Sequence, residues 1–279
     1  MGTEGIEPRI YIDRCEKLGY HPNFWLSETY FKHAEWRVEQ IGNYLHVYDS
    51  DGVNMLPPVN RYYTSNKEKL DIFRSMEYVW ALYPEITNFM NGNMWMREHM
   101  KKLDEQFIFE PSDFLTMDGG DWATFRKNCR KFPNRYEGGE LRAAISHSRD
   151  EETIDATLEI LVEWLSTLGP DAEIYDDDVI LSYCKDPDAS VHYIFDDDSE
   201  KILAVNIFDS NYAYTNFRYC LCRNLPYLSE YARWRFYTDN VSRWKRVNDG
   251  GSLGNPKLHA FKKKMNPAET FIVYTFNQK

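Results

Sequence analysis

The sequence predicts an α+β fold in which a mixed sheet is flanked by helices. Three observations lead to this prediction: residues 25–59 consist largely of strand-forming runs, residues 151–168 carry one apolar stripe at helical spacing, and residues 190–276 alternate apolar strands with helical segments. A chain of 279 residues has room for one large domain or for two of about 140 residues. Both halves mix strands with helices, which leaves a degenerate duplication open.

The N-terminal half opens with strands. Two apolar runs surround a turn signal at 49–52, which predicts a hairpin. Ser65 and Glu68 form a capping box, and apolar residues then recur at helical spacing as far as Trp80, so we expect one amphipathic helix that ends before Pro84. The most basic stretch of this half follows at GGDWATFRKNCRKF, with four cations within six residues: Arg126, Lys127, Arg130 and Lys131.

The C-terminal half has the clearest pattern. The helix at 151–168 is expected to end at Gly169-Pro170. SVHYIF and ILAVNIF flank the charged stretch 196–200 and predict an antiparallel hairpin, and NYAYTNFRYCLC supplies a third strand. A helix at 228–237, a short strand at 244–247, a helix at 256–264 and a last strand, ETFIVYTF, follow. Since 133–148 is polar, we place the boundary there and predict two domains, 1–138 and 139–279.

Composition narrows the class of protein. The net charge of −11 disfavours sequence-independent binding of nucleic acid by the whole surface, although a local basic patch remains compatible with it. The five cysteines are odd in number and scattered, which predicts a reducing compartment. Cys220 and Cys222 are expected to be core residues rather than a metal or redox pair. No apolar run is long enough to span a membrane, so we expect a cytoplasmic protein without membrane insertion.

Three motifs carry a family resemblance. In VNDGGSLGNPKLHAFKKKMNP a glycine-rich turn precedes L-x-x-F-K, with a proline five residues after the lysine; the positions are Gly250, Gly251, Gly254, Leu258, Phe261, Lys262 and Pro267. A glycine, an aromatic residue and a basic run recur at Gly119, Trp122, Arg126, Lys127, Lys131 and Phe132. A weaker D-G-x-x-x-L-P-P echo lies at Asp51, Gly52, Leu56, Pro57 and Pro58. Together they resemble the phosphatidylglycerol lysyltransferase C-terminal family.

The resemblance implies a fold and an activity. The family is similar to paired GNAT-like domains, so the mixed sheet is expected to form two such domains in tandem. The family includes enzymes that move an amino acid from aminoacyl-tRNA to a lipid headgroup. Two departures matter. The loop that would cradle the pyrophosphate of acetyl-CoA reads CRNLPYLSEY, and because it has no glycine and contains Pro226, acetyl-CoA is in doubt. No membrane-embedded region precedes the motifs, which makes a lipid acceptor less favoured.

The resemblance also points to site residues, each with a structural alternative. Lys262 is the leading candidate for binding a phosphate or carboxylate, against a solvated helix lysine. The basic run is expected to hold the phosphates of a tRNA acceptor end, against an ordinary basic surface helix. Asp249 is a candidate for the substrate amine, against capping of the glycine-rich turn. Tyr212, Tyr214 and Asn216 alternate along the third strand and would border the acceptor, against core packing.

The complete expectation is therefore a transferase without a metal or a resident cofactor. Asp249 and Tyr214 are the predicted catalytic residues, and the predicted substrate-binding residues are Arg126, Lys127, Lys131, Tyr212, Asn216, Asn224, Asn248 and Lys262. Aminoacyl-tRNA is the preferred donor and co-substrate, and an amine or hydroxyl on a small molecule or a nucleic acid is the acceptor. Two alternatives stay open: an acetyl-CoA-dependent N-acetyltransferase, and a non-catalytic binding module on the same fold.

Overall fold

The computed structural model describes residues 6–20, 24–61, 66–168, 175–210 and 214–278. Ser65 of the predicted capping box, the predicted helix end at Gly169-Pro170 and the site candidate Tyr212 lie outside these residues. The chain divides into two compact units: Met1–Gln106 with Phe271–Lys279 (unit 1), and Phe107–Thr270 (unit 2). The predicted boundary at 138/139 falls inside unit 2, and the division into domains 1–138 and 139–279 stays a prediction.

Unit 1 contains an antiparallel sheet of β1 (Arg37–Ile41), β2 (Tyr44–Tyr48) and β3 (Asn54–Asn60). The hairpin predicted around 49–52 is confirmed, since β2 pairs with β3 across it and Gly52 has a φ of 82°. The helices are α1 (Pro8–Lys17), α2 (Glu28–His33), α3 (Asn66–Ser75), α4 (Pro84–Asn91) and α5 (Met94–Glu98). Their buried faces form one core with the sheet, centred on Tyr11, Phe31, Leu45, Val47 and Tyr83.

Two predictions in unit 1 were wrong. Residues 25–59 are not all strand, because the Ser27 side chain accepts a hydrogen bond from the Tyr30 amide and starts α2. The helix expected up to Trp80 ends at Ser75 instead, since the amides of Trp80 and Ala81 bond to carbonyls of β3 and residues 78–79 form β4 (Tyr78–Val79). Strand pairing therefore overrides the helical spacing of Met76 and Trp80.

Unit 2 is built on a mixed sheet in the order β5-β10-β9-β8-β7-β6. The strands are β5 (Met100–Phe109, which begins in unit 1), β6 (Leu141–Ser146), β7 (Ser190–Asp196), β8 (Ile202–Ser210), β9 (Thr215–Cys222) and β10 (Val247–Asn248). All neighbours are antiparallel except β9 and β10, which run parallel. The last strand, β11 (Glu269–Asn277), continues into unit 1, where it pairs with β4.

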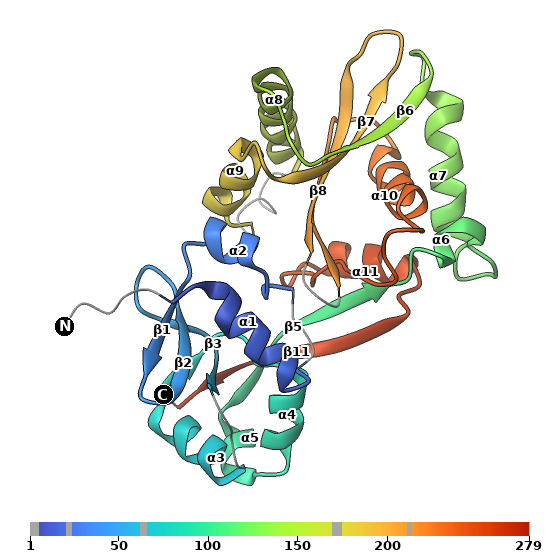
Figure 1. Ribbon diagram of the computed structural model, residues 1–279. Coiled ribbons are helices and arrows are strands. Elements are labelled where there is room, and N and C mark those ends of the chain that lie inside the picture. The colour runs from blue at the N-terminus through green and yellow to red at the C-terminus, as the bar shows by residue number, and fades with distance from the viewer. Residues whose placement is uncertain (1–5, 21–23, 62–65, 169–174, 211–213, 279) are drawn as a thin grey trace. The chain divides into compact units, whose positions relative to one another are not determined.

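Helices cover both faces of this sheet. Figure 1 shows α8 (Glu151–Leu168) and α9 (Asp177–Lys185) on one face, and α7 (Ala123–Arg135) and α10 (Leu228–Asp239) on the other. The short α6 (Asp113–Thr116) and α11 (Pro256–Lys264) complete the unit. Under α7 and α10 lies an aromatic core, in which the rings of Phe114 and Tyr237 stack with centroids 4.0 Å apart. This core fixes the rotation of α10 and hence the direction of its polar side chains.

Most predictions for the C-terminal half were confirmed. The hairpin is β7–β8, the third strand is β9, and the predicted helices correspond to α8, α10 and α11. Two elements were missed. β6 lies in the polar stretch 133–148, and α9 begins in the acidic run Asp176–Asp178. The Asp176 carboxylate caps α9 by accepting from the Val179 amide (3.1 Å), so this acidic run starts a helix.

The five cysteines are free and buried, as expected for core residues.

Candidate active site

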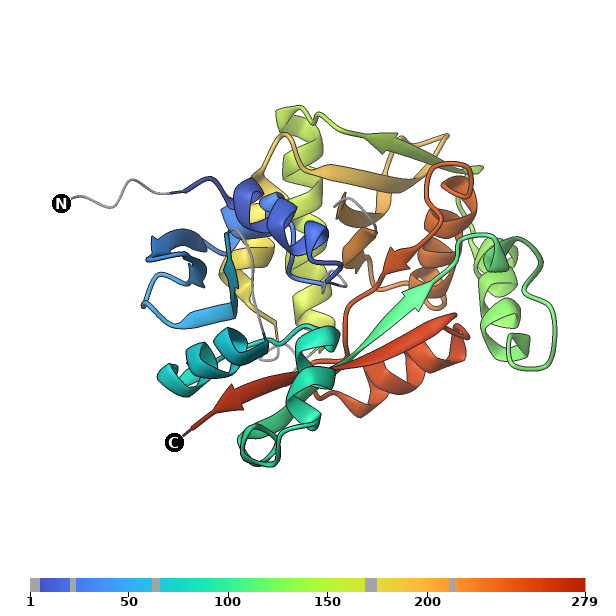
Figure 2. The ribbon, with the colours of Figure 1, turned by 60° about the horizontal axis from the view of Figure 1, so that its bottom comes forward.

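A buried ionic network forms where β9 and β10 diverge. The two strands pair through Thr215–Val247 and Asn216–Asn248. Beyond that point the chain after β10 leaves β9 and stays bonded to β5, with the Asp249 amide 2.9 Å from the Phe107 carbonyl oxygen. In the turned view of Figure 2, β5 and β10 lie side by side. Asp249 is therefore the first residue after the fork between β9 and β10.

The Asp249 carboxylate is surrounded by donors. Its side chain is 1% exposed. Oδ2 accepts from the Tyr237 hydroxyl at 2.9 Å and from the Arg233 guanidinium, and Oδ1 lies 3.1 Å from Nζ of Lys262. Lys262 also donates to the Asp249 carbonyl oxygen. We call Asp249, Arg233, Tyr237 and Lys262 the fork network.

Local structure brings these four residues together. Arg233 and Tyr237 are one helical turn apart on α10, so both side chains point the same way. The Arg233 guanidinium also stacks over the Phe217 ring of β9, 4.6 Å from its centroid. Lys262 comes from α11, which starts at the N-cap Asn255 and has Pro256 at its first position. Side chains of two helices, α10 and α11, thus converge on one carboxylate.

The charges of the network fix its protonation. Burial would raise the pKa of Asp249, but Arg233 and Lys262 outweigh burial and lower it below the ordinary value. Burial and the neighbouring carboxylate raise the pKa of Tyr237 well above its usual range. Asp249 is therefore ionised at neutral pH with both oxygens engaged, which suits it to holding cations and makes it a poor base. With Arg233 and Lys262 both protonated, these two cations and Asp249 together carry one net positive charge. This charge favours an anionic or oxyanionic ligand.

The Tyr237 hydroxyl gives a prediction about stability. Replacing Tyr237 with Phe removes one hydrogen bond to a buried carboxylate, and we expect the free energy of unfolding to fall by about 1.5–3 kcal/mol in urea titrations. The matched control is Tyr193→Phe, because the Tyr193 hydroxyl is buried without a hydrogen-bond partner among the described residues. The control is expected to be neutral or stabilising. Equal losses in the two variants would show that the hydroxyl of Tyr237 contributes nothing specific.

The structure brings some predicted site residues together and separates others. Asp249 and Lys262 meet in the fork network, next to Asn248, whose Oδ1 accepts from the Gly250 amide (2.9 Å) and caps the turn. The Tyr214 hydroxyl accepts a hydrogen bond from Arg246 at 3.3 Å. Asn216 belongs to a second buried cluster.

That second cluster lies on β8 and β9. The Asp209 carboxylate accepts from Arg218 Nε at 2.6 Å, from Arg218 Nη2 at 3.0 Å and from the Asn216 amide at 3.0 Å. The Tyr183 hydroxyl of α9 donates to it at 2.8 Å. The Arg218 side chain is completely buried, and that of Asp209 is 4% exposed. A bidentate pair with two further donors, one of them from Asn216, holds α9 to the sheet.

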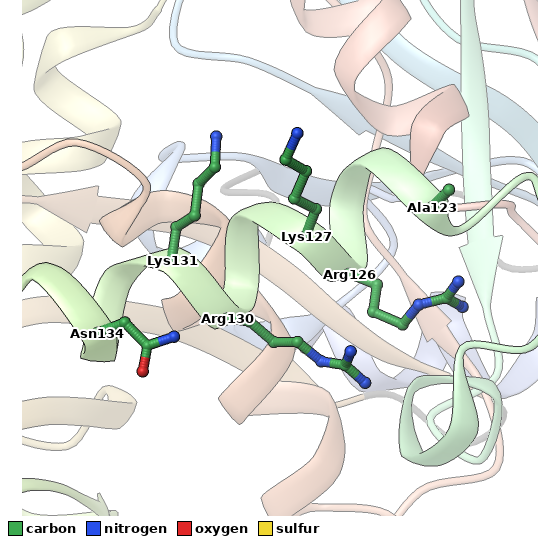
Figure 3. Close-up of a pocket in the computed structure, with 6 residues that line it drawn as sticks. All are labelled: Ala123, Arg126, Lys127, Arg130, Lys131 and Asn134. Atoms are coloured by element: carbon green, nitrogen blue, oxygen red, sulfur yellow. The ribbon is translucent and has the colours of Figure 1, made fainter.

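The basic run forms a groove along α7. Its volume is about 310 Å³, and it is lined by Ala123, Arg126, Lys127, Arg130, Lys131 and Asn134. Figure 3 shows Lys127 and Lys131 extending to one side of the helix and Arg126 and Arg130 to the other. None of the lining residues is acidic. This cationic groove contains three of the predicted binding residues and adds Arg130.

Two cations of the groove have partners. Arg126 donates to the carbonyl oxygens of Met117 and Gly119 and holds the loop before α7. Nζ of Lys131 lies 3.2 Å from the Tyr227 hydroxyl and 4.5 Å from the ring centroid. Lys131 thereby lowers the pKa of Tyr227. Tyr227 directly precedes α10 with a φ of 69°, so the basic groove adjoins the start of that helix.

The loop between β9 and α10 is engaged by a carboxylate of the same chain. Oε1 of Glu163, on α8, accepts from the Asn224 amide at 2.6 Å, and Oε2 accepts from Arg223 at 3.1 Å. The backbone donor of Asn224 is therefore used by Glu163. Asn224 was predicted to bind substrate, and in the structure its backbone amide binds Glu163.

Sequence reasoning missed Arg233 and Tyr237. Both lie on a helix that was predicted, and their spacing of four residues was visible. Their partner is sixteen and twelve residues away in the chain, however, and only the fold places Asp249 beside them. No sequence signal links these positions.

Two classes of feature are absent from the part of the chain that the structure describes. It contains no cluster of three or more His, Cys, Asp or Glu side chains arranged to hold a metal ion. Nor does any of its helices have the length and apolar character required to cross a membrane.

Solved structures share this fold. A conserved protein of unknown function from Bacteroides thetaiotaomicron matches 98% of this chain and 99% of its own, with a TM-score of 0.67 and 13% identity. L-PGS from Bacillus licheniformis matches 100% and 94%, with a TM-score of 0.65 and 14% identity. The C-terminal domain (DUF2156) assigned to a lysylphosphatidylglycerol synthetase from Agrobacterium fabrum matches 98% and 93%, with a TM-score of 0.61 and 12% identity.

At the level of sequence, no family model matches the chain, and no curated protein matches it. The three solved structures are 13%, 14% and 12% identical to this chain, which is too low for an activity to be transferred, so the similarity shows the fold alone. The resemblance to the phosphatidylglycerol lysyltransferase C-terminal family is thus confirmed at the level of the fold: the chain has a GNAT-like α+β fold with a mixed sheet flanked by helices.

Proposed function

We propose that this protein is a GNAT-like transferase that moves an aminoacyl group from aminoacyl-tRNA onto an amine or hydroxyl acceptor. The observation that carries the proposal is the cationic groove of α7, lined by four basic residues and no acid in a chain of net charge −11. A nucleic-acid donor requires such a local concentration of positive charge, because phosphate contacts supply most of its affinity. The similarity to L-PGS and to the DUF2156 domain agrees with it.

The loop between β9 and α10 argues for the same donor. GNAT-like folds that use acetyl-CoA bind its pyrophosphate through free amides at this place. Here the Asn224 amide is taken by Glu163, whose negative charge repels a phosphate, and Pro226 lacks an amide hydrogen. An acyl-CoA donor is therefore disfavoured on electrostatic grounds.

The proposed reaction needs little covalent chemistry from the protein. The acceptor nitrogen or oxygen attacks the ester carbonyl carbon, a new C–N or C–O bond forms, the ester bond to the ribose oxygen breaks, and that oxygen takes up the proton lost by the acceptor. We assign to Lys262 the stabilisation of the developing oxyanion, and to Asp249, with Arg233 and Tyr237, the positioning of Lys262. Tyr214 and Asn216 remain candidates for the border of the acceptor site.

Transfer of label tests this proposal. Purified protein is incubated in clarified extract with a mixed pool of radiolabelled aminoacyl-tRNAs, and label is followed into products that are no longer tRNA. We expect a protein-dependent product that Lys262→Met reduces at least a hundredfold and that Lys264→Met leaves within twofold, since Lys264 is exposed on the same helix. Absence of any product, in an extract where a control transferase is active, would contradict the proposal.

A further inference from the structure

Cys220 and Cys222 form a pair of thiols near the end of β9. Alternate residues of a strand point to the same face of the sheet, and both side chains belong to the aromatic core under α7 and α10. Their Sγ atoms are 3.6 Å apart, close enough for a weak hydrogen bond between the two sulfurs. Strand alternation predicted the shared face, and the structure adds the contact between the sulfurs.

The pair differs from the other three cysteines in exposure. Cys220 and Cys222 are 9% and 7% exposed, whereas Cys15 and Cys184 are completely buried and Cys129 is 2% exposed. Burial raises the pKa of these three thiols, for Cys15 and Cys184 to about 12. A buried thiol with a raised pKa stays protonated and is inert. Of the five cysteines, the pair is therefore the most accessible to a small polar oxidant.

The surroundings of Cys220 favour its thiolate. The hydrogen bond with Cys222 lowers the pKa of Cys220, and the positive charge of Arg233 in the fork network lowers it further. Burial and the carboxylates of Asp249 and Glu230 act in the opposite direction, but the pKa of Cys220 still falls below the ordinary value. The same hydrogen bond raises the pKa of Cys222. Cys220 is therefore the nucleophile of the pair, and Cys222 stays protonated beside it.

The backbone of β9 allows a bridge between these sulfurs only under strain. Alternate residues of a strand are about 6.6 Å apart, near the upper end of the Cα separations that a disulfide spans, about 4.4–6.8 Å. The end of the strand is held in place, because both cysteines pair with β8 and the Arg223 amide donates to the Leu203 carbonyl oxygen at 2.9 Å. A disulfide formed here is strained, and strained disulfides are readily reduced.

From these observations we infer that Cys220 and Cys222 are a redox site, which hydrogen peroxide converts reversibly to an intramolecular disulfide. The Cys220 thiolate attacks one peroxide oxygen: an S–O bond forms, the O–O bond breaks, and the leaving hydroxide takes the proton that Cys220 released. The Cys222 sulfur then attacks the resulting sulfenic sulfur: the S–S bond forms, the S–O bond breaks, and hydroxide leaves with the Cys222 proton as water. The two thiols lose two electrons, and the peroxide gains them.

Mapping of the thiols in the wild-type protein tests the inference. Native protein is treated with hydrogen peroxide, its free thiols are blocked with iodoacetamide in urea, and its disulfides are then reduced and labelled with N-ethylmaleimide. Trypsin cuts after Arg218 and Arg223, so the peptide Tyr219–Arg223 contains both cysteines of the pair and no other. We expect maleimide on both of them, about tenfold more than on Cys129, and return of both free thiols when dithiothreitol follows the peroxide.

Two variants identify the partners. Cys222→Ala is expected to stop the reaction at a sulfenic acid on Cys220, which dimedone traps, whereas the matched control Cys184→Ala should leave disulfide formation within about twofold. Equal maleimide labelling of all five cysteines would overturn the inference. So would a Tyr219–Arg223 peptide recovered with two iodoacetamide-blocked thiols or with sulfinic acids. The wild-type map decides without any variant, and no step uses transfer activity, so the inference stands or fails independently of the proposed function.

Discussion

Replacing Asp249 with asparagine is expected to lower the free energy of unfolding by about 3–5 kcal/mol. The substitution keeps the shape of the side chain and removes its charge. Arg233 and Lys262, whose side chains are 10% and 5% exposed, would then be buried together without the negative charge of Asp249. The asparagine NH₂ group would also face one of these cations as a second donor. Urea titration at neutral pH measures the loss.

A control and a pH profile make this prediction specific. Asp155→Asn changes an exposed aspartate on α8 and is expected to cost less than about 0.5 kcal/mol. The pKa of Asp249 is lowered in the folded state, so its contribution is complete above the unfolded carboxyl pKa of about 4 and is lost as pH falls through the lower folded pKa. The difference between wild type and Asp249→Asn should therefore shrink in acid. If Asp249→Asn lowered the free energy of unfolding by less than about 1 kcal/mol at neutral pH, Asp249 would not be the counter-charge of two buried cations.

Arg218→Met is expected to have the second large effect, again about 3–5 kcal/mol of unfolding free energy. Methionine fills much of the arginine volume, but it removes the bidentate cation from the buried Asp209 carboxylate, to which Asn216 and Tyr183 contribute neutral donors. The side chain of Arg218 is completely buried, so solvent does not screen the loss.

A double-mutant cycle distinguishes a broken ion pair from lost packing. Asp209→Asn combined with Arg218→Met removes both charges, and we expect the double variant to lose at least 1 kcal/mol less than the sum of the two single variants. Chemical denaturation of the four proteins supplies the cycle. Additive losses would mean that the pair contributes through side-chain packing alone, contrary to the geometry of its two hydrogen bonds.

Periodicity in the sequence predicted much of unit 2 because its elements are long and regular. The apolar stripe of α8 and the alternating runs of β7 and β8 are each explained by burial of one face. α9 was missed because Asp176–Asp178 looks solvated when its capping bond to Val179 is unknown. The predicted helix was longer than α3 because Trp80 fits helical spacing, whereas in the structure the Trp80 amide donates to a carbonyl oxygen of β3. Local patterns do not contain these long-range hydrogen bonds.

The candidate site was predictable in part for the same reason. Asp249 and Lys262 lie in one motif, thirteen residues apart, and the structure joins them. Arg233 and Tyr237 reach that motif only through the packing of α10 on the sheet. Strand alternation puts Asn216 on the same face as Tyr214, but it does not show that the Asn216 amide donates to Asp209 in the second buried cluster. Alternation of residues along a strand predicts which face of the sheet a side chain lies on, but it does not predict the side chain's hydrogen-bond partner.

Whether the protein takes its acyl group from aminoacyl-tRNA or from acetyl-CoA is the central question, and one paired measurement answers it. The same preparation and extract receive either aminoacyl-tRNA labelled in the amino acid or acetyl-CoA labelled in the acetyl group, at equal concentration, and protein-dependent product is counted. We predict protein-dependent label from aminoacyl-tRNA and none from acetyl-CoA, because Glu163 engages the Asn224 amide and repels a phosphate. Transfer of acetyl label by the wild-type protein, with none from aminoacyl-tRNA, would contradict the account.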